Sequence, residues 1–157
     1  MVAGHRILLM LGLIELVSSP NISHFFVTAL QQRCSVITNP ENGETVIIDG
    51  GGDSDRIIQW IDNGIGNPDF EIGEYSGKRK VVALLNTHAH FDHSGHIPYF
   101  KKHYGLDWWL HKDDFFLQSL AQKSGARWGF SLPEPAEAEN TWAVSYTHLT
   151  LPTICSV

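Results

Sequence analysis

The chain has 157 residues, of which 43% are hydrophobic and 18% charged, and its formal net charge is −6. This composition is typical of a globular domain or of part of one. The acidic balance, without clusters of Lys and Arg, argues against nucleic acid as a partner. Cys34 and Cys155 alone provide no disulfide framework, and Cys34 is expected to be a packed thiol.

Residues 1–22 are predicted to be an N-terminal extension. The apolar run Ile7–Ile14 resembles the hydrophobic part of a secretory signal, but Glu15 interrupts it and it is too short to span a bilayer. A non-native start, a poorly structured leader and a signal peptide over residues 1–19 all stay open. We expect a cytoplasmic protein, or a secreted or periplasmic one if the signal peptide is real.

Three strands are predicted next, over His24–Thr28, Ser35–Thr38 and Thr45–Ile48. Asn42 and Gly43 can adopt positive φ angles in the turn between the last two strands. The pattern therefore predicts a β-hairpin.

The glycine-rich loop Asp49–Asp53 follows the third strand. It lacks the Lys and Ser/Thr of a phosphate-binding loop, so nucleotide binding is rejected and a tight turn is expected. A helix over Asp55–Asn63, capped by Asp53 or Ser54, ends at Gly64. Its apolar face consists of Ile57, Ile58, Trp60 and Ile61.

The segment from Gly66 to Lys80 is predicted to be a polar connection. It ends in the basic run Lys78–Lys80, for which a solvated loop is the default interpretation. The apolar run Val81–Leu85 then predicts a buried strand.

The stretch Thr87–His96 follows this strand and concentrates the candidate chemistry of the chain. Three imidazoles and one carboxylate fall within six positions, a density that suits Zn²⁺, Mn²⁺ or Fe²⁺. The alternative is a polar loop that happens to be rich in His. The candidate ligands are His88, His90, Asp92 and His93.

Alternation in an extended chain predicts that His88 and His90 converge while Ala89 points away. A turn after His90 would bring Asp92 and His93 to a neighbouring position, so the spacing suits two adjacent metals. A helix predicted to begin near Ser94 would favour the neutral, ligating form of His93 through its dipole.

Downstream, a helix carrying Pro98 in its first turn is predicted to end at Gly105, followed by the strand Leu106–Leu110. Another helix is predicted over Lys112–Ser124, closed by Gly125. Its inward side chains are expected to be Phe116, Leu117 and Leu120, and surface or packing roles are expected for His96, His103 and His111.

The pattern His88-x-His90-x-Asp92-His93 resembles the metal-binding signature of the metallo-β-lactamase superfamily. Leu30–Ile37 and Thr45–Asp53 are similar to its hydroxyacylglutathione hydrolase (glyoxalase II-like) branch, and the resemblance covers His24 to Trp142. It implies an α/β protein of stacked α and β layers, specifically the first half of an αββα sandwich.

The resemblance also implies two Zn²⁺ ions, with Fe or Mn possible. His88 and His90 would hold the first ion, and Asp92 and His93 the second. Asp92 would also orient a metal-activated hydroxide that attacks the carbonyl of a small, anionic thioester. Asp49 would orient the metal-binding loop without binding the metal itself. The alternative is that Asp49 is an ordinary Asp of a turn at the end of a strand.

Other functions stay open: a persulfide dioxygenase-like enzyme with one iron, a β-lactamase, or a non-catalytic protein of the same fold. The expected domain covers residues 23–143. Residues 144–157 resemble a translated transposase sequencing adapter, and His148 within them does not match the turn that holds the next ligand of the family. With four of seven ligands, the chain itself is expected to bind metal weakly and to be inactive.

Overall fold

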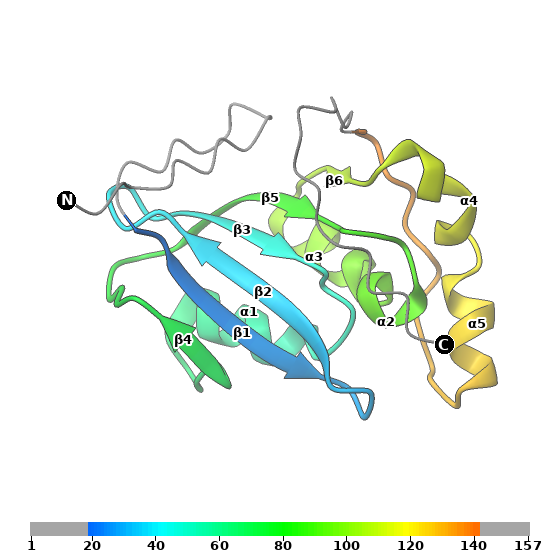
Figure 1. Ribbon diagram of the computed structural model, residues 1–157, viewed down its shortest axis with the longest axis horizontal. Coiled ribbons are helices and arrows are strands. Elements are labelled where there is room, and N and C mark those ends of the chain that lie inside the picture. Colours follow the sequence, from blue (N-terminus) through cyan, green and yellow to red (C-terminus); the bar gives the residue numbers. More distant parts are fainter. Residues whose placement is uncertain (1–18, 142–157) are drawn as a thin grey trace, which may run out of the picture.

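A computed structural model describes residues 19–141 (Figure 1). The predicted tail, 144–157, lies outside the described residues, as does most of the predicted extension. Strand β1 begins at Asn21, two residues before the expected domain boundary. Within the described range no helix is long and apolar enough to cross a membrane.

Six strands form one mixed sheet in the order β4-β1-β2-β3-β5-β6. The four strands β4, β1, β2 and β3 pair antiparallel, whereas β3, β5 and β6 run parallel. The strands are β1 (Asn21–Val27), β2 (Gln32–Thr38), β3 (Glu44–Ile48), β4 (Phe70–Ile72), β5 (Lys80–Leu85) and β6 (Trp108–Trp109).

The predicted hairpin is confirmed as β2–β3. Thr38 pairs with Thr45, and Gly43 adopts a φ of 75° in the turn, a conformation that costs glycine little. The side chains of β2 alternate between buried and more exposed positions, so one face of the sheet is directed into a core.

The helices lie to one side of the sheet and along one of its ends (Figure 1). The core joins Phe25, Val36, Ile47 and Leu84 of the strands to helical residues such as Phe100, all fully buried. The helical segments are α1 (Ser54–Asn63), α2 (Phe91–Ser94), α3 (Ile97–Tyr104), η1 (Lys112–Asp114), α4 (Phe115–Gln118) and α5 (Ala121–Arg127).

A second apolar cluster is formed by Val46, Ala83 and Leu85, against which Ile48 and Trp109 pack. In β3, Val46 and Ile48 alternate with the core residue Ile47, so this cluster is on the opposite face of the sheet. One sheet with helices on one face and apolar side chains on the other is the arrangement expected of half an αββα sandwich.

The first predicted helix is confirmed as α1, and its end at Gly64 has the expected left-handed conformation (φ 67°). Ile57, Trp60 and Ile61 are buried as predicted. Asp53 occupies the cap position but makes no side-chain cap hydrogen bond. Its carboxylate instead accepts a hydrogen bond from the backbone N–H of Thr28 (3.2 Å).

The predicted helix over Lys112–Ser124 is wrong as one element, because the chain forms η1, α4 and α5 in succession. Phe116 and Leu120, expected to point inward, are 66% and 44% exposed. Gly125 does not end the helix but lies buried within α5, where an added Cβ would come within 2.6 Å of the Leu132 side chain. A broken helix rotates successive apolar side chains off one common face.

The polar connection contains the edge strand β4, which sequence reasoning missed. The prediction of a solvated loop over Lys78–Lys80 is wrong at Arg79, because its side chain is only 8% exposed. Its guanidinium stacks 4.0 Å from the centre of the Trp60 ring and donates a hydrogen bond to Asn21 Oδ1. The long alkyl stem of Arg allows the residue to pack where a charge count predicts solvent.

His96 joins the beginnings of α1 and α3. The backbone N–H of Ser54 donates to His96 Nδ1 (3.3 Å), and the Ser54 hydroxyl lies 3.0 Å from the same nitrogen. Burial lowers the pKa of His96, although Asp53 and Asp55 act in the opposite direction. Its packing role agrees with the sequence-based expectation.

This contact predicts a pH dependence of stability. Because the pKa of folded His96 is lower than in the unfolded chain, the unfolded state binds the proton more readily, and stability is lost as the pH falls below about 6.5. Urea unfolding at pH 7.5 and 5.5 should show a larger loss for the natural chain than for H96N, which keeps an acceptor but does not titrate. Equal losses in both proteins would contradict the assignment.

Candidate metal centre

The candidate centre lies where β3 and β5 end side by side. Ile48 pairs in parallel with Leu85, so the loops that follow the two strands leave the same edge of the sheet. The backbone N–H of Asp49 donates to the Leu85 carbonyl (3.0 Å), which extends the contact beyond the strands. The glycine-rich loop and the His-rich loop are therefore neighbours.

The His-rich loop brings three imidazoles together. The ring centres of His88 and His90 are 4.6 Å apart, and those of His88 and His93 are 4.0 Å apart. Ala89 is 1% exposed and points away, as strand alternation predicts.

The helix predicted near Ser94 begins at Ile97, as α3, and a short helix that was not predicted, α2, precedes it. His90 is extended (φ −61°, ψ 149°), and α2 starts directly after it at Phe91. His93 therefore lies in the last turn of a four-residue helix, and the argument from an N-terminal helix dipole does not apply to it. The short helix does supply the predicted turn, which places His93 Nε2 3.6 Å from Asp92 Oδ2.

The four candidate ligands are gathered but do not form a finished site. Within residues 19–141, no three His, Cys, Asp or Glu side chains meet as a group that could hold a metal ion. The donor types nevertheless fit zinc or iron, since neutral imidazole and carboxylate are ordinary ligands of both. Burial, more than the neighbouring His93 and His90, lowers the pKa of His88 and favours its neutral, ligating form.

Asp49 connects the two loops. Its carboxylate accepts hydrogen bonds from the backbone N–H of Thr87 (2.7 Å) and from the Thr87 hydroxyl (2.8 Å), and it lies 3.2 Å from His93 Nδ1. Asp49 is 6% exposed and has a φ of 59°, which is uncommon for a residue other than glycine. Such a conformation persists only where surrounding contacts hold it.

These contacts determine the orientation of His88. The Thr87 hydroxyl donates its one hydrogen to Asp49, so it can only accept from His88 Nδ1, which lies 2.9 Å away. Nδ1 of His88 then carries the proton, and Nε2 presents the lone pair that a metal requires.

The glycine-rich loop approaches the His-rich loop so closely that no side chain fits between them at Gly51. A Cβ added at Gly51 would overlap the carbonyl group of Asp92, and one at Gly50 would come within 2.8 Å of the Phe100 ring. The tight turn expected from the sequence is confirmed here, and its glycines allow the close approach.

Asn86 is an organising residue that sequence reasoning missed. Its side-chain amide donates to the carbonyl oxygens of His88 (3.1 Å) and His93 (2.8 Å), and its Oδ1 accepts from Trp108 Nε1 (3.0 Å). Asn86 and Trp108 are both 1% exposed. A polar residue directly after the apolar run Val81–Leu85 was the available signal, but its partners come from distant positions.

The remaining His and Cys residues singled out from the sequence stay apart from the centre. His103 Nε2 contacts Asp62 (2.6 Å) on the helical layer, and His111 accepts from the backbone N–H of Asp113 at the start of η1. Cys34 is fully buried, and burial raises the pKa of its thiol, as expected for a packed residue. His148 lies outside the described residues.

Comparison with known proteins identifies the family. Residues 27–150 match the sequence model of the metallo-beta-lactamase superfamily. The match covers more than half of the chain, and the protein therefore belongs to the metallo-β-lactamase superfamily.

Among curated relatives, the chain is 38% identical over 106 residues to hydroxyacylglutathione hydrolase GloC of Haemophilus influenzae. The match covers 66% of this chain and 43% of that protein. An uncharacterised protein of Aquifex aeolicus is 30% identical over 85 residues, which cover 54% of this chain and 33% of that protein. The chain thus spans less than half the length of both relatives.

Two solved structures share the fold. The B3 metallo-beta-lactamase BLEG-1 superposes with a TM-score of 0.62 at 22% identity, over 84% of this chain and 57% of that one. The di-iron-bound form of TTHA1623 superposes with a TM-score of 0.61 at 23% identity, over 76% and 53%. At these identities the similarity establishes the fold alone.

The hydrogen bonds of Asn86 yield a prediction. N86A should lower the free energy of unfolding by about 2–3 kcal/mol, because two loop carbonyls and a buried indole N–H lose their partner. The matched control is N63A, at an exposed position near the end of α1, which should stay within about 0.5 kcal/mol. Urea unfolding measures both; equal effects would contradict the role given to Asn86.

Proposed function

We propose that this chain carries the first part of the catalytic domain of a metal-dependent thioester hydrolase of the hydroxyacylglutathione hydrolase type. The observation that carries the proposal is the gathering of His88, His90, Asp92 and His93 in front of the buried carboxylate of Asp49. The relation to GloC supports a thioester as the substrate.

His88 and His90 would hold one metal ion, and Asp92 and His93 a second, with further ligands coming from outside residues 19–141. When bound, two Zn²⁺ ions supply Lewis-acid polarisation of the substrate carbonyl and lower the pKa of water. Zinc is the proposed metal, and iron is the alternative.

The protein groups contribute orientation and charge. Asp92, as a carboxylate, can accept a hydrogen bond from the attacking water and fix its direction. Asp49 holds the backbone of Thr87 and, through the Thr87 hydroxyl, leaves the lone pair of His88 on Nε2. A thiolate leaves a tetrahedral intermediate readily, so the proposed reaction requires no separate acid.

The substrate proposed is a small anionic thioester, and the proposed location is the cytoplasm. A negatively charged substrate would be attracted by the bound metals and not by the protein as a whole, since the chain carries a net charge of −6.

The first test is metal binding by this chain, measured by titration with Co²⁺ and the visible absorbance of the bound ion. H88A and D49N should each weaken binding about tenfold or more, through loss of a ligand and of its orienting partner respectively. H103A is the matched control, because His103 contacts a carboxylate outside the centre and should leave Co²⁺ affinity unchanged. Equal affinity in all four proteins would refute the proposed site.

The second test is catalysis by a protein of the relatives' full length, recovered by amplifying the locus from source DNA. With zinc, it should hydrolyse S-lactoylglutathione, and D92N should lower kcat about 100-fold or more. The 157-residue chain, also loaded with zinc, should be inactive. Nitrocefin hydrolysis without thioesterase activity would favour a β-lactamase, one bound iron would favour a persulfide dioxygenase, and no metal and no activity would favour a non-catalytic protein.

A further inference from the structure

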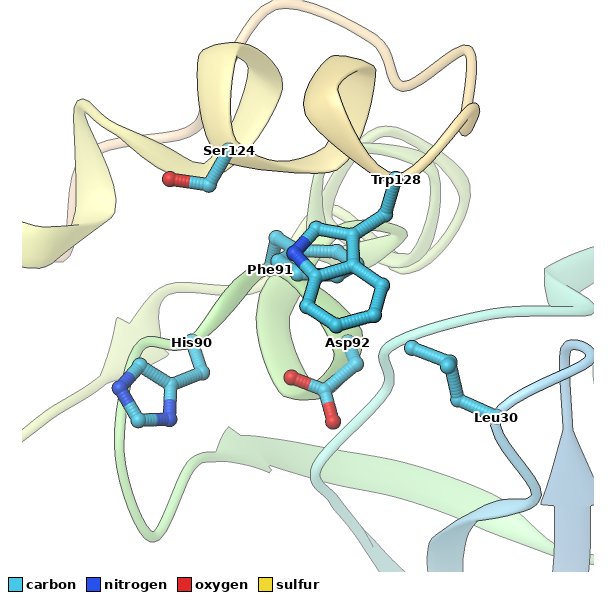
Figure 2. A pocket seen from close by; sticks show the side chains of 6 residues that line it. All are labelled: Leu30, His90, Phe91, Asp92, Ser124 and Trp128. Atoms are coloured by element: carbon cyan, nitrogen blue, oxygen red, sulfur yellow. The ribbon is translucent and has the colours of Figure 1, made fainter.

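A pocket of about 370 Å³ opens beside the candidate metal centre (Figure 2). Its walls come from three separate parts of the chain: the β1–β2 turn, the end of the His-rich loop with α2, and α5 with the residue that follows it. The lining residues are Leu30, His90, Phe91, Asp92, Ser124 and Trp128.

The pocket is continuous with the proposed reaction site, because His90 and Asp92 belong to both. In Figure 2, the Asp92 carboxylate lies below Trp128, between His90 and Leu30. A group attached directly to the carbonyl under attack would therefore lie within reach of these apolar walls.

Large apolar side chains form most of the remaining wall. Trp128 is 69% exposed and Leu30 is 41% exposed, so both present apolar surface to the solvent-filled space. Exposed apolar surface concentrated around a few polar groups is the usual character of a small-molecule site.

The back of the pocket is held in place by packing. The Phe91 ring lies 5.7 Å from the centre of the Phe130 ring. α5 packs beside α2, and its Gly125 leaves room for the Leu132 side chain, since a Cβ there would come within 2.6 Å of Leu132. These contacts fix the Phe91 side of the pocket.

The charge of the lining indicates which end of a thioester fits. The six residues include one carboxylate, one imidazole and one hydroxyl, but neither Lys nor Arg. No Lys or Arg of the lining could pair with a carboxylate-bearing group in the apolar part of the pocket, whereas a neutral hydrocarbon group would bury the apolar walls.

We propose that this pocket binds the acyl group of the substrate and selects acyl groups with an extended apolar chain over acetyl-sized ones. The identification of the occupant as an acyl group rests on the proposed thioesterase function. The selectivity for apolar groups rests on the pocket alone.

The experiment uses neutral mimics of the acyl group, so that neither metal nor hydrolysis is required. Acetamide, butyramide and hexanamide are titrated into the 157-residue chain with a chelator present, and the backbone amide and indole N–H signals are followed by NMR, the backbone amides serving for the Trp128 variants. Each added methylene should tighten Kd about two- to fourfold, and the signal absent from W128F should shift.

Two variants and one control make the result specific. W128A should weaken hexanamide binding about tenfold while leaving acetamide binding nearly unchanged, and L30A should act in the same direction. F116A is the control, since Phe116 is similarly exposed, at 66%, and does not line the pocket. Because Leu30 and Trp128 are both exposed, their replacement should leave the chain folded. Far-UV circular dichroism checks this for each variant.

Equal affinity for the three amides, or equal effects of W128A, L30A and F116A, would overturn the proposal. Failure of the thioesterase assay gives a different pattern: the full-length protein would hydrolyse no thioester although hexanamide still binds at Trp128. That result would support the apolar pocket and refute the proposed thioesterase reaction.

Discussion

The parallel pairing of β3 with β5 is the constraint on which the candidate centre depends. It places the ends of two strands at one edge of the sheet, although 38 positions separate Asp49 from Thr87. The buried carboxylate of Asp49 then joins the two loops through two hydrogen bonds to Thr87. Charge-assisted bonds of this kind are about twice as strong as neutral ones, so a buried carboxylate with two of them can hold a loop firmly.

A second set of contacts reinforces the first from the other side. Asn86 lies between β5 and the His-rich loop. Its side-chain NH2 donates hydrogen bonds to two carbonyls of that loop, and its Oδ1 accepts one from the Trp108 indole of β6. Gly51 allows the opposite backbone to touch Asp92. The loop is thus held by a carboxylate, an amide and a close backbone contact, while the exposed side of His90 remains open to the pocket.

Local patterns in the sequence predicted a substantial part of this structure. The hairpin, α1 with its glycine end, and the convergence of His88 with His90 all follow from residues close together in the chain. The failures arose where a distant partner decides the outcome. Arg79 is buried because its guanidinium stacks on Trp60 and donates a hydrogen bond to Asn21. Asn86 organises the loop in part because its Oδ1 accepts a hydrogen bond from Trp108.

The break between α4 and α5 could not be predicted from the periodicity of apolar residues either. The helical pattern of Phe116, Leu117 and Leu120 is intact in the sequence, yet only Leu117 of the three packs against the core. The tight fit of Gly125 against the Leu132 side chain positions α5 independently of that pattern. Tertiary packing there overrode a weak local preference.

The separation of Asp49 from Thr87 has a consequence for the order of events during folding. A contact between residues this far apart forms only after the intervening loop has closed, whereas a hairpin such as β2–β3 closes over a few residues. We therefore expect the ligand cluster to assemble after the hairpin, when β5 docks beside β3. Metal ions would meet correctly oriented ligands only in the folded sheet. Their binding would therefore raise the free energy of unfolding of the completed fold, and it would not nucleate folding.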